Sequence, residues 1–380
     1  MWASLSCLSS SRVLCVLAGF VVGVLSTSCK WPKINFTRQP PTDWGFGKRN
    51  DRLYSLDHGK LNIELPPKSM WMNMGYWRGT DDFPTACQAL LIEVLKKAKL
   101  LDDTGKSPAP KLRQGLKRLS ILDLGFGCGD QTAFLVQLAR VPLKYVGITL
   151  DYRQYRFAQN RLGPCNNQGD KKDVQIFCED AARVNTWPDD LHRAVASLNG
   201  QEQSNNSHDT DEIWVLALDS LYHFSPSRKP VLSLAAQNLN ASVMAFDMLL
   251  SSSASFHQRW VLKLIAWMGD CPVHAFMTRE RYTEMLAEAG YDRDHIEFHD
   301  VTADVFEPLA RYMRKRSGDL EDVGLKLGSL NIARLVFDWW ARSRVLEAVI
   351  VVAREVVSRC RGDEAKWVKE IIICRFGDWC

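Results

Sequence analysis

Short apolar runs typical of strands alternate along the middle of the chain with segments of helical periodicity. The runs lie at 119–124, 145–150, 174–178, 213–218 and 242–246. Segments with helical spacing follow at 132–140, 152–162, 191–198 and from 229 onward. Alternating strands and helices are best accommodated by a parallel sheet that is covered on both faces. The pattern therefore predicts an α/β domain.

Two further segments frame this region. Residues 84–101 carry apolar side chains at helical spacing and predict a helix before the first strand. Residues 102–117 contain Gly and Pro and predict a loop, and the polar stretch 200–211 predicts a surface insertion. Residues 31–70 lack periodicity and are interpreted as a linker and lead-in.

Composition excludes several classes of protein. The chain has 380 residues, 46% of them hydrophobic and 24% charged, which is not the composition of a disordered or many-pass membrane protein. A net charge of +4 is too small to indicate nucleic-acid binding. The 11 cysteines include no CxxC pair, so we expect no zinc site and predict reduced thiols.

A glycine-rich motif follows the first predicted strand. The sequence Ile121–Thr132 contains Asp123 followed by Gly125, Gly127 and Gly129. Glycines let the backbone approach a ligand closely. A dinucleotide fingerprint would place Gly at position 130, where the chain has Asp, and the G-K-[ST] of a P-loop is missing. The motif therefore favours a ligand without a pyrophosphate, and the Asp123 carboxylate could bind an ammonium group or the backbone of the turn.

This motif resembles the first motif of class I S-adenosylmethionine-dependent methyltransferases, and the segments after it occur in the family's order. The resemblance covers 71–354, most of the chain. It implies a Rossmann-like, doubly wound, mostly parallel seven-stranded sheet in a domain at 71–357, with further strands at 296–302 and 345–353. A helical cap at about 251–340 and a C-terminal tail at 358–380 complete the expected organisation.

The resemblance also implies cofactor-binding residues. The sequence Gly147–Gln154 resembles a variant of cyclopropane fatty acid synthases and of tocopherol and macrolide O-methyltransferases, in which the equivalents of Thr149, Leu150 and Gln154 line the ribose and adenosine. Many members carry an acid where this chain has Thr149, and Asp151 is an alternative carboxylate; Gln154 could equally be a solvated helix residue. The other positions implied to bind S-adenosyl-L-methionine are Tyr76, Trp77, Asp123, Gly125, Gly127, Gly129, Asp180 and Ala181.

A segment that resembles the family's fourth motif contains the candidate catalytic residues. The sequence Ile213–Phe224 includes Asp219, Tyr222 and His223. His223 is the best candidate for a general base, because a neutral imidazole titrates near working pH. Asp219 lies four residues before it, on the same predicted turn, and Tyr222 is expected to orient the acceptor. The alternative is that His223 only positions the substrate.

We therefore predict a methyltransferase that acts on a small, largely apolar acceptor such as a lipid, isoprenoid or natural product. The alternatives are a noncatalytic methyltransferase-like binding protein and a nicotinamide-dependent oxidoreductase on a similar sheet. The predicted cap contains four tryptophans, Trp260, Trp267, Trp339 and Trp340. Three roles are open for them: the core of the cap, the wall of an apolar pocket, or a membrane-facing surface. The acceptor atom and the oligomeric state are left open.

The N-terminus contains an uncharged apolar run at Val13–Leu25. At about 1.5 Å per residue it is shorter than the roughly 30 Å hydrocarbon core of a bilayer. Residues 1–30 are therefore a short signal anchor, a cleaved signal peptide or a buried helix. A cytosolic cofactor favours the anchor, with the catalytic domain facing the cytosol and the endoplasmic reticulum as the expected membrane; the alternative location is the cytoplasm.

Overall fold

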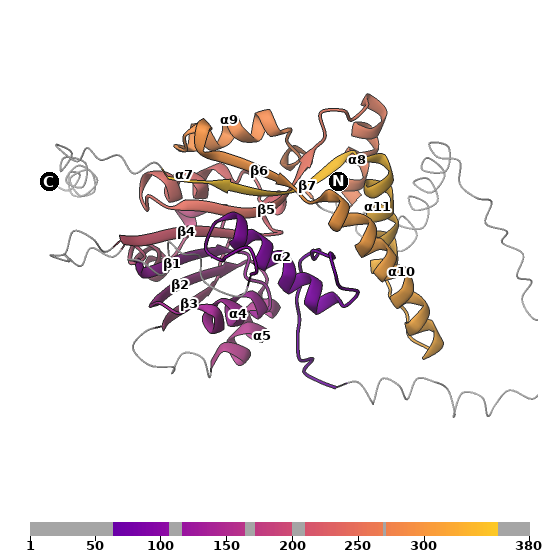
Figure 1. Cartoon of the computed structure of the whole chain (residues 1–380), viewed down its shortest axis with the longest axis horizontal. Helices are drawn as coiled ribbons and strands as arrows, with labels where there is room; N and C mark the ends of the chain where they lie inside the picture. The colour runs from indigo at the N-terminus through magenta and orange to yellow at the C-terminus, as the bar shows by residue number, and fades with distance from the viewer. Residues whose placement is uncertain (1–63, 106–115, 164–171, 200–209, 269–270, 356–380) are drawn as a thin grey trace, which may run out of the picture.

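The computed structural model describes residues 64–105, 116–163, 172–199, 210–268 and 271–355 (Figure 1). The predicted anchor or signal segment at 1–30, most of the lead-in at 31–70 and the tail at 358–380 lie outside the described residues. Within those residues, no helix combines the length and the apolar content that crossing a membrane requires.

A seven-stranded sheet forms the centre of the fold, in the order β3-β2-β1-β4-β5-β7-β6. The strands are β1 (Leu116–Leu124), β2 (Leu143–Thr149), β3 (Lys172–Cys178), β4 (Thr210–Leu218), β5 (Ser242–Leu250), β6 (Ile296–Asp300) and β7 (Leu346–Ala353). Strands β1 to β5 pair in parallel, and β7 is antiparallel to both β5 and β6. The predicted mostly parallel, doubly wound sheet is confirmed.

Nine α-helices of the described residues surround the sheet. They are α2 (Phe83–Lys97), α4 (Asp130–Leu138), α5 (Tyr152–Leu162), α6 (Asp189–Ala196), α7 (Lys229–Gln237), α8 (Phe256–Met268), α9 (Arg279–Ala289), α10 (Phe306–Asp322) and α11 (Leu330–Ser343). Figure 1 shows α8, α10 and α11 gathered beyond one end of the sheet, where the sequence predicts a cap.

The core lies on both faces of the sheet. Successive residues of a strand point to opposite faces, and accordingly Ile121 belongs to one buried cluster and Leu122 to the other. The first cluster includes α2 residues such as Leu91, and the second includes Leu232 of α7 and Leu286 of α9. Because both faces are covered, the central strands read as continuous apolar runs rather than as alternating ones.

The four tryptophans of the cap form two pairs that differ in solvent exposure. Trp339 and Trp340 of α11 are buried in the first cluster, where the Trp340 ring meets Phe306 of α10 with centroids 5.5 Å apart. Trp260 and Trp267 of α8 are exposed. The sequence did not separate these pairs, because all four tryptophans lie in helices of similar composition.

Candidate functional site

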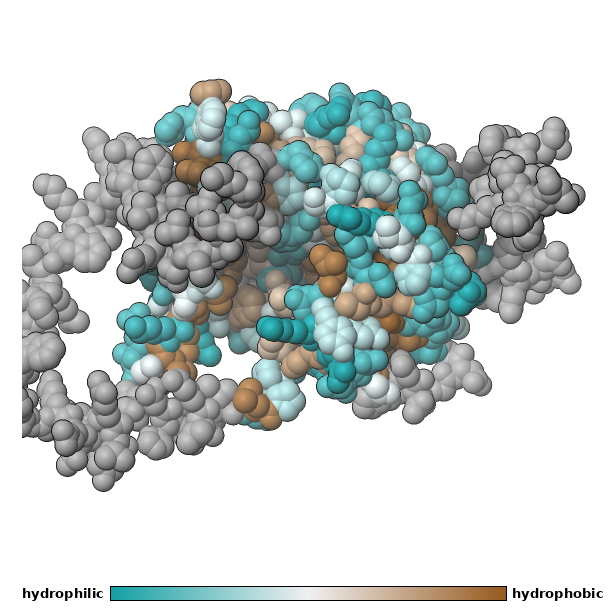
Figure 2. All heavy atoms as spheres, turned by 180° about the vertical axis from the view of Figure 1, so that it is seen from behind, coloured by the Kyte–Doolittle hydropathy of each residue, from teal (hydrophilic) through white to brown (hydrophobic). Residues whose placement is uncertain are grey.

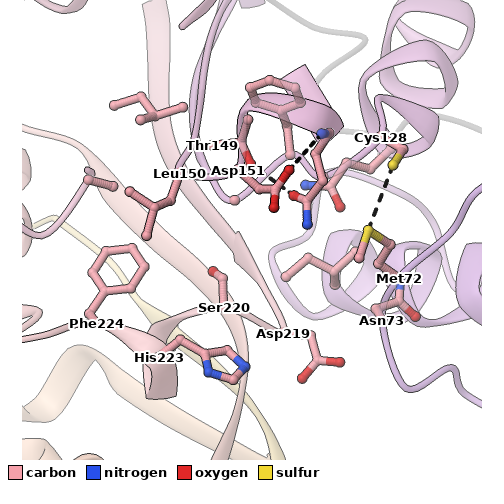
Figure 3. A pocket seen from close by; sticks show the side chains of 18 of the residues that line it. Met72, Asn73, Cys128, Thr149, Leu150, Asp151, Asp219, Ser220, His223 and Phe224 are labelled. Carbon is pink, nitrogen blue, oxygen red and sulfur yellow. Dashed lines mark hydrogen bonds between the residues drawn. The ribbon is translucent and has the colours of Figure 1, made fainter. Parts of the chain in front are cut away.

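A cavity of about 680 Å³ opens where four neighbouring strands end. Its wall includes the residues directly after β1, β2, β3 and β4, namely Gly125, Leu150, Glu179 and Asp219. The order of strands reverses on either side of β1, and ligands of open α/β sheets bind at the carboxyl ends of the strands beside such a reversal. Figure 3 shows side chains from these strand ends and from Met72 and Asn73 around one space.

The glycine loop forms one wall of the cavity. Gly127 has a φ of +62°, and a Cβ added there would meet only the Met72 Sδ atom, at 3.8 Å. Gly125 has a φ of +110°, and a Cβ there would lie 2.7 Å from the Ser220 Cβ. Gly125 therefore lets β1 and β4 approach each other, whereas Gly127 keeps its edge of the cavity open. Gly129 does not line the cavity; it packs the start of α4 against Ala158 of α5.

Asp123 lies beneath this loop and does not line the cavity. Its carboxylate accepts hydrogen bonds from the Gln131 side chain, at 2.7 and 2.8 Å, and from the Tyr145 hydroxyl at 2.6 Å. Complete burial raises the pKa of Asp123 to about 7. Through these bonds Asp123 joins β1 to α4 and β2.

The residues after β2 lie in the cavity wall together. The Thr149 hydroxyl donates a hydrogen bond to Gln154 Oε1 at 3.0 Å, and Leu150, although 72% exposed, also borders the cavity. Asp151 caps α5, since its Oδ1 accepts the backbone N–H groups of Arg153 and Gln154 at 2.7 and 3.0 Å. The cap fixes the first turn of α5 and with it the position of Gln154 in the wall.

The residues after β3 supply acidic groups. Glu179, Asp180 and Ala181 all line the cavity. The Asp180 carboxylate accepts the Ala182 N–H at 2.9 Å and pairs with Arg183 at 3.2 Å. Glu179 donates its backbone N–H to the Thr149 carbonyl at 3.0 Å, which holds the two strand ends together.

Asp219, Tyr222 and His223 converge on the same cavity from the end of β4 and the 3-10 helix η4 (Leu221–His223). Asp219 has a φ of +66°, an uncommon conformation for a residue other than glycine. Its carboxylate accepts the Met74 N–H at 2.8 Å and the Tyr222 hydroxyl at 2.7 Å. Burial raises the pKa of Asp219 to about 7 and lowers the pKa of His223 below its usual value.

The segment before α2 contributes different residues from those expected. Met70 to Asn73 line the cavity, whereas Tyr76 and Trp77 do not. The backbone turns at Gly75, with a φ of +75°, and Tyr76 and Trp77 are buried in the first core cluster. There the Trp77 ring lies 5.0 Å from that of Tyr312 on α10. Tyr76 and Trp77 therefore pack in the core beside the cavity.

Several wall residues were missed by sequence reasoning. Met72, Asn73, Asp130, Arg183, Ser220 and Phe224 line the cavity without having been singled out. Each of them lies within five residues of a position selected from the sequence. For Arg183, Ser220 and Phe224, proximity to a strand end was the available signal, since the motifs after β3 and β4 begin there. Among the described residues, no cluster of His, Cys, Asp and Glu is suited to hold a metal ion.

No family model matches the chain, and no curated protein matches it either. Solved structures do. A [4+2]-cyclase is similar at 17% identity over 81% of this chain and 96% of its own, with a TM-score of 0.48. A cyclopropane synthase from Mycobacterium tuberculosis is similar at 13% identity over 75% and 90%, with a TM-score of 0.48.

A geranyl diphosphate C-methyltransferase from Streptomyces coelicolor, solved with S-adenosyl-L-homocysteine, is similar at 14% identity over 71% of this chain and 80% of its own, with a TM-score of 0.43. These names describe the matched proteins. The chain's own strand order defines its fold: a Rossmann-like, doubly wound sheet ending in an antiparallel pair, the fold that the resemblance to class I methyltransferases implies.

Proposed function

We propose that the chain is an S-adenosylmethionine-dependent methyltransferase that acts on a small, largely apolar acceptor. One observation carries the proposal. Residues selected from four separate motifs, between Gly125 and His223, line a single cavity at the carboxyl ends of adjacent strands. If the four motifs were unrelated turns on the surface, their spacing along the chain would give no reason for their residues to line one cavity.

The wall fits the parts of S-adenosyl-L-methionine. Gly127 presents backbone without a side chain to the cavity, which suits close approach of the methionine portion. We assign the adenine edge to Asp180 and Ala181 and the ribose to Thr149, Leu150 and Gln154. Asp151 and Glu179 are the carboxylates at the strand ends that substitute for the acid missing at Thr149. When bound, the cofactor supplies an electrophilic methyl group.

The remaining wall favours an acceptor that is apolar and uncharged. Trp71, Met72 and Phe224 contribute apolar surface. Arg183 is the only Arg or Lys among the described residues that line the cavity, and it is paired with Asp180. An anionic group on the acceptor would therefore lose its hydration without gaining a free cation, which is costly.

His223 is placed to take a proton from the acceptor. Its ring projects into the cavity, and partial desolvation by the cavity wall lowers its pKa below the ordinary value, which favours the neutral imidazole at pH 7. The rings of Tyr222 and His223 lie 4.3 Å apart, and Tyr222 is in turn held by Asp219. We propose His223 as general base and Asp219 and Tyr222 as the residues that position it and the acceptor.

Two measurements on the full chain test this function. Calorimetric titration is expected to show binding of S-adenosyl-L-methionine and no tight binding of NADH. Profiling of cells fed labelled methionine is expected to show a labelled apolar product that disappears when His223→Ala replaces the wild type. Tight NADH binding alone would identify an oxidoreductase, whereas cofactor binding without any labelled product would identify a noncatalytic binding protein.

We also propose that residues 1–30 anchor the chain to a membrane with the catalytic domain in the cytosol. The support is the apolar run Val13–Leu25 and the cytosolic origin of the proposed cofactor. Asn35 and Asn205 each begin an N-x-[ST] sequence and serve as reporters. In a eukaryotic host both are expected to carry no glycan, so a glycosidase-sensitive mass would contradict this topology.

A further inference from the structure

Helix α8 has an outward face of large aromatic side chains. Phe256, Trp260 and Trp267 are 77%, 59% and 65% exposed. Their spacing of four and seven residues places them on one side of an α-helix, because 3.6 residues make one turn. The opposite side of α8, with Val261, Leu262 and Ile265, is buried in the first core cluster. The helix thus carries large apolar side chains on its outward side as well as on its buried side.

An apolar outward stripe on a helix needs an explanation, since a helix that covers a core usually presents a polar face to water. Single exposed apolar residues are common, but a contiguous row of them marks an interaction surface. Figure 2 shows hydrophobic residues on the upper left, on the side of the molecule where the cap lies. The exposed Phe256, Trp260 and Trp267 of α8 indicate that this face contacts something other than water.

The charges of α8 indicate what that contact is. Lys263 lies on the same face, with its ammonium 6.0 Å from the centre of the Trp260 ring. Arg259 lies at the edge of the face, where its Nε donates to the Ala254 carbonyl at 3.0 Å. The helix contains no Asp or Glu. Tryptophans flanked by cationic side chains suit the boundary between lipid headgroups and acyl chains, and the missing acids suit an anionic surface.

The C-terminal end of α8 continues onto the wall of the candidate site. The Cys271 backbone N–H donates a hydrogen bond to the Ala266 carbonyl at 2.9 Å, and the Cys271 thiol donates one to the Tyr222 carbonyl at 3.3 Å. The His274 ring then lies at hydrogen-bond distance, 2.8 Å, from the Pro226 carbonyl. The aromatic face of α8 therefore connects through a short segment to the residues around His223.

We propose that the outward face of α8, formed by Phe256, Trp260, Lys263 and Trp267, binds the surface of an anionic lipid bilayer. The helix lies in the plane of the interface with its aromatic side chains among the lipid headgroups. This contact is independent of the apolar run at 13–25, and it does not require that the chain transfers methyl groups. It places the wall of the cavity next to a phase in which apolar acceptors dissolve.

The experiment measures co-sedimentation of the full chain with vesicles of phosphatidylcholine, with and without phosphatidylserine. Trp260→Gln is expected to lower the partition coefficient at least about threefold, and Trp260→Gln with Trp267→Gln at least about tenfold. Vesicles with brominated acyl chains should quench the tryptophan fluorescence of the wild type more than that of the double variant. Phosphatidylserine should strengthen the binding of the wild type.

Tyr152→Gln is the matched control. Tyr152 is 60% exposed on α5, and the Arg156 guanidinium lies 6.0 Å from the centre of its ring, so it copies the exposure and the cation of Trp260. This variant should partition like the wild type. Unchanged thermal melting of all variants excludes unfolding as the cause.

Equal partition and equal quenching of the wild type and the double variant would overturn the proposal. So would a change from dimer to monomer on gel filtration with unchanged vesicle binding, because a second copy of the chain would then cover α8. Binding of S-adenosyl-L-methionine, measured on the same variants, separates this outcome from a failure of the proposed function.

Discussion

The Tyr222 hydroxyl donates a 2.7 Å hydrogen bond to Asp219, the residue directly after β4, whose backbone is left-handed. The same carboxylate accepts the Met74 N–H at 2.8 Å. Asp219 therefore joins the segment before α2 to the turn that carries His223. Residues with uncommon backbone conformations cluster at ligand-binding and active sites. Here the positive φ of Asp219 accompanies its hydrogen bond to Tyr222, and both residues line the cavity.

Gly127→Val is expected to abolish calorimetric binding of S-adenosyl-L-methionine, because the new side chain would extend into the cavity. Gly79→Val is the matched control. Gly79 also has a positive φ, of +80°, and no atom lies within 4 Å of an added Cβ, but it does not line the cavity. Both variants carry about 1–2 kcal/mol of backbone strain. Equal binding by the two would remove Gly127 from the proposed cofactor site.

His223→Ala is expected to lower turnover by about 10²–10⁴-fold and to leave cofactor affinity nearly unchanged, as for the loss of a general base. His192→Ala serves as the control, since the His192 ring packs against Trp187 and does not line the cavity. A reduction of less than about tenfold would leave His223 with a positioning role only.

The pH profile gives an independent reading of the same residue. Desolvation in the cavity wall lowers the pKa of His223 below its ordinary value of 6.5, so the ring remains neutral into mildly acidic solution. Asp219, with a pKa of about 7, titrates in the same wall, so the profile of His223 is measured in Asp219→Asn. In that variant activity should be constant near pH 7 and fall only as the pH drops below about 6.5. An acidic limb centred above pH 7 would contradict the assignment.

Asp123 is expected to make stability depend on pH. Its folded-state pKa of about 7 exceeds the ordinary value of 3.8, so the folded chain binds the proton more tightly than the unfolded chain does. The resulting stabilisation is complete below about pH 4 and is lost as the pH rises to about 7, at about 1.4 kcal/mol per unit of pKa difference. Urea unfolding of the wild type and Asp123→Asn between pH 4 and 8 should show a smaller decline for the variant.

Arg228 and Asp247 form a buried ion pair that links α7 to β5. The Tyr282 hydroxyl of α9 also donates to Asp247, at 3.0 Å. Arg228→Met would leave the carboxylate buried without its cation, at a cost of about 3–5 kcal/mol in the free energy of unfolding. Arg281→Ala, which removes an exposed pair with Glu284, should cost less than about 1 kcal/mol. Similar losses of unfolding free energy in both variants would show that the buried ion pair contributes no more to stability than the exposed one.

The sequence by itself determined the alternation of strands and helices and the carboxyl ends of β1, β3 and β4, whereas β5 extends to Leu250, four residues beyond its predicted end. These are local properties, because the spacing of apolar residues sets which face of an element is buried. Helix α5 begins and ends where the sequence predicts it, at Tyr152 and Leu162. The sequence likewise predicted the tight turn at Gly125 and Gly127, and both residues have the positive φ that glycine adopts without steric cost.

Only the tertiary structure decided which side chains face the cavity and which face the core. The resemblance implied that Tyr76 and Trp77 bind the cofactor, yet after the turn at Gly75 both are buried in the core, with Trp77 against Tyr312 of α10, and Met72 and Asn73 line the cavity. Trp260 and Trp340 occupy helices of similar composition, but Trp340 is buried against Phe306 of α10, whereas Trp260 is exposed. Asp123 finds its partners on α4 and β2. Each of these outcomes depends on contacts between segments distant in sequence, which local periodicity does not specify.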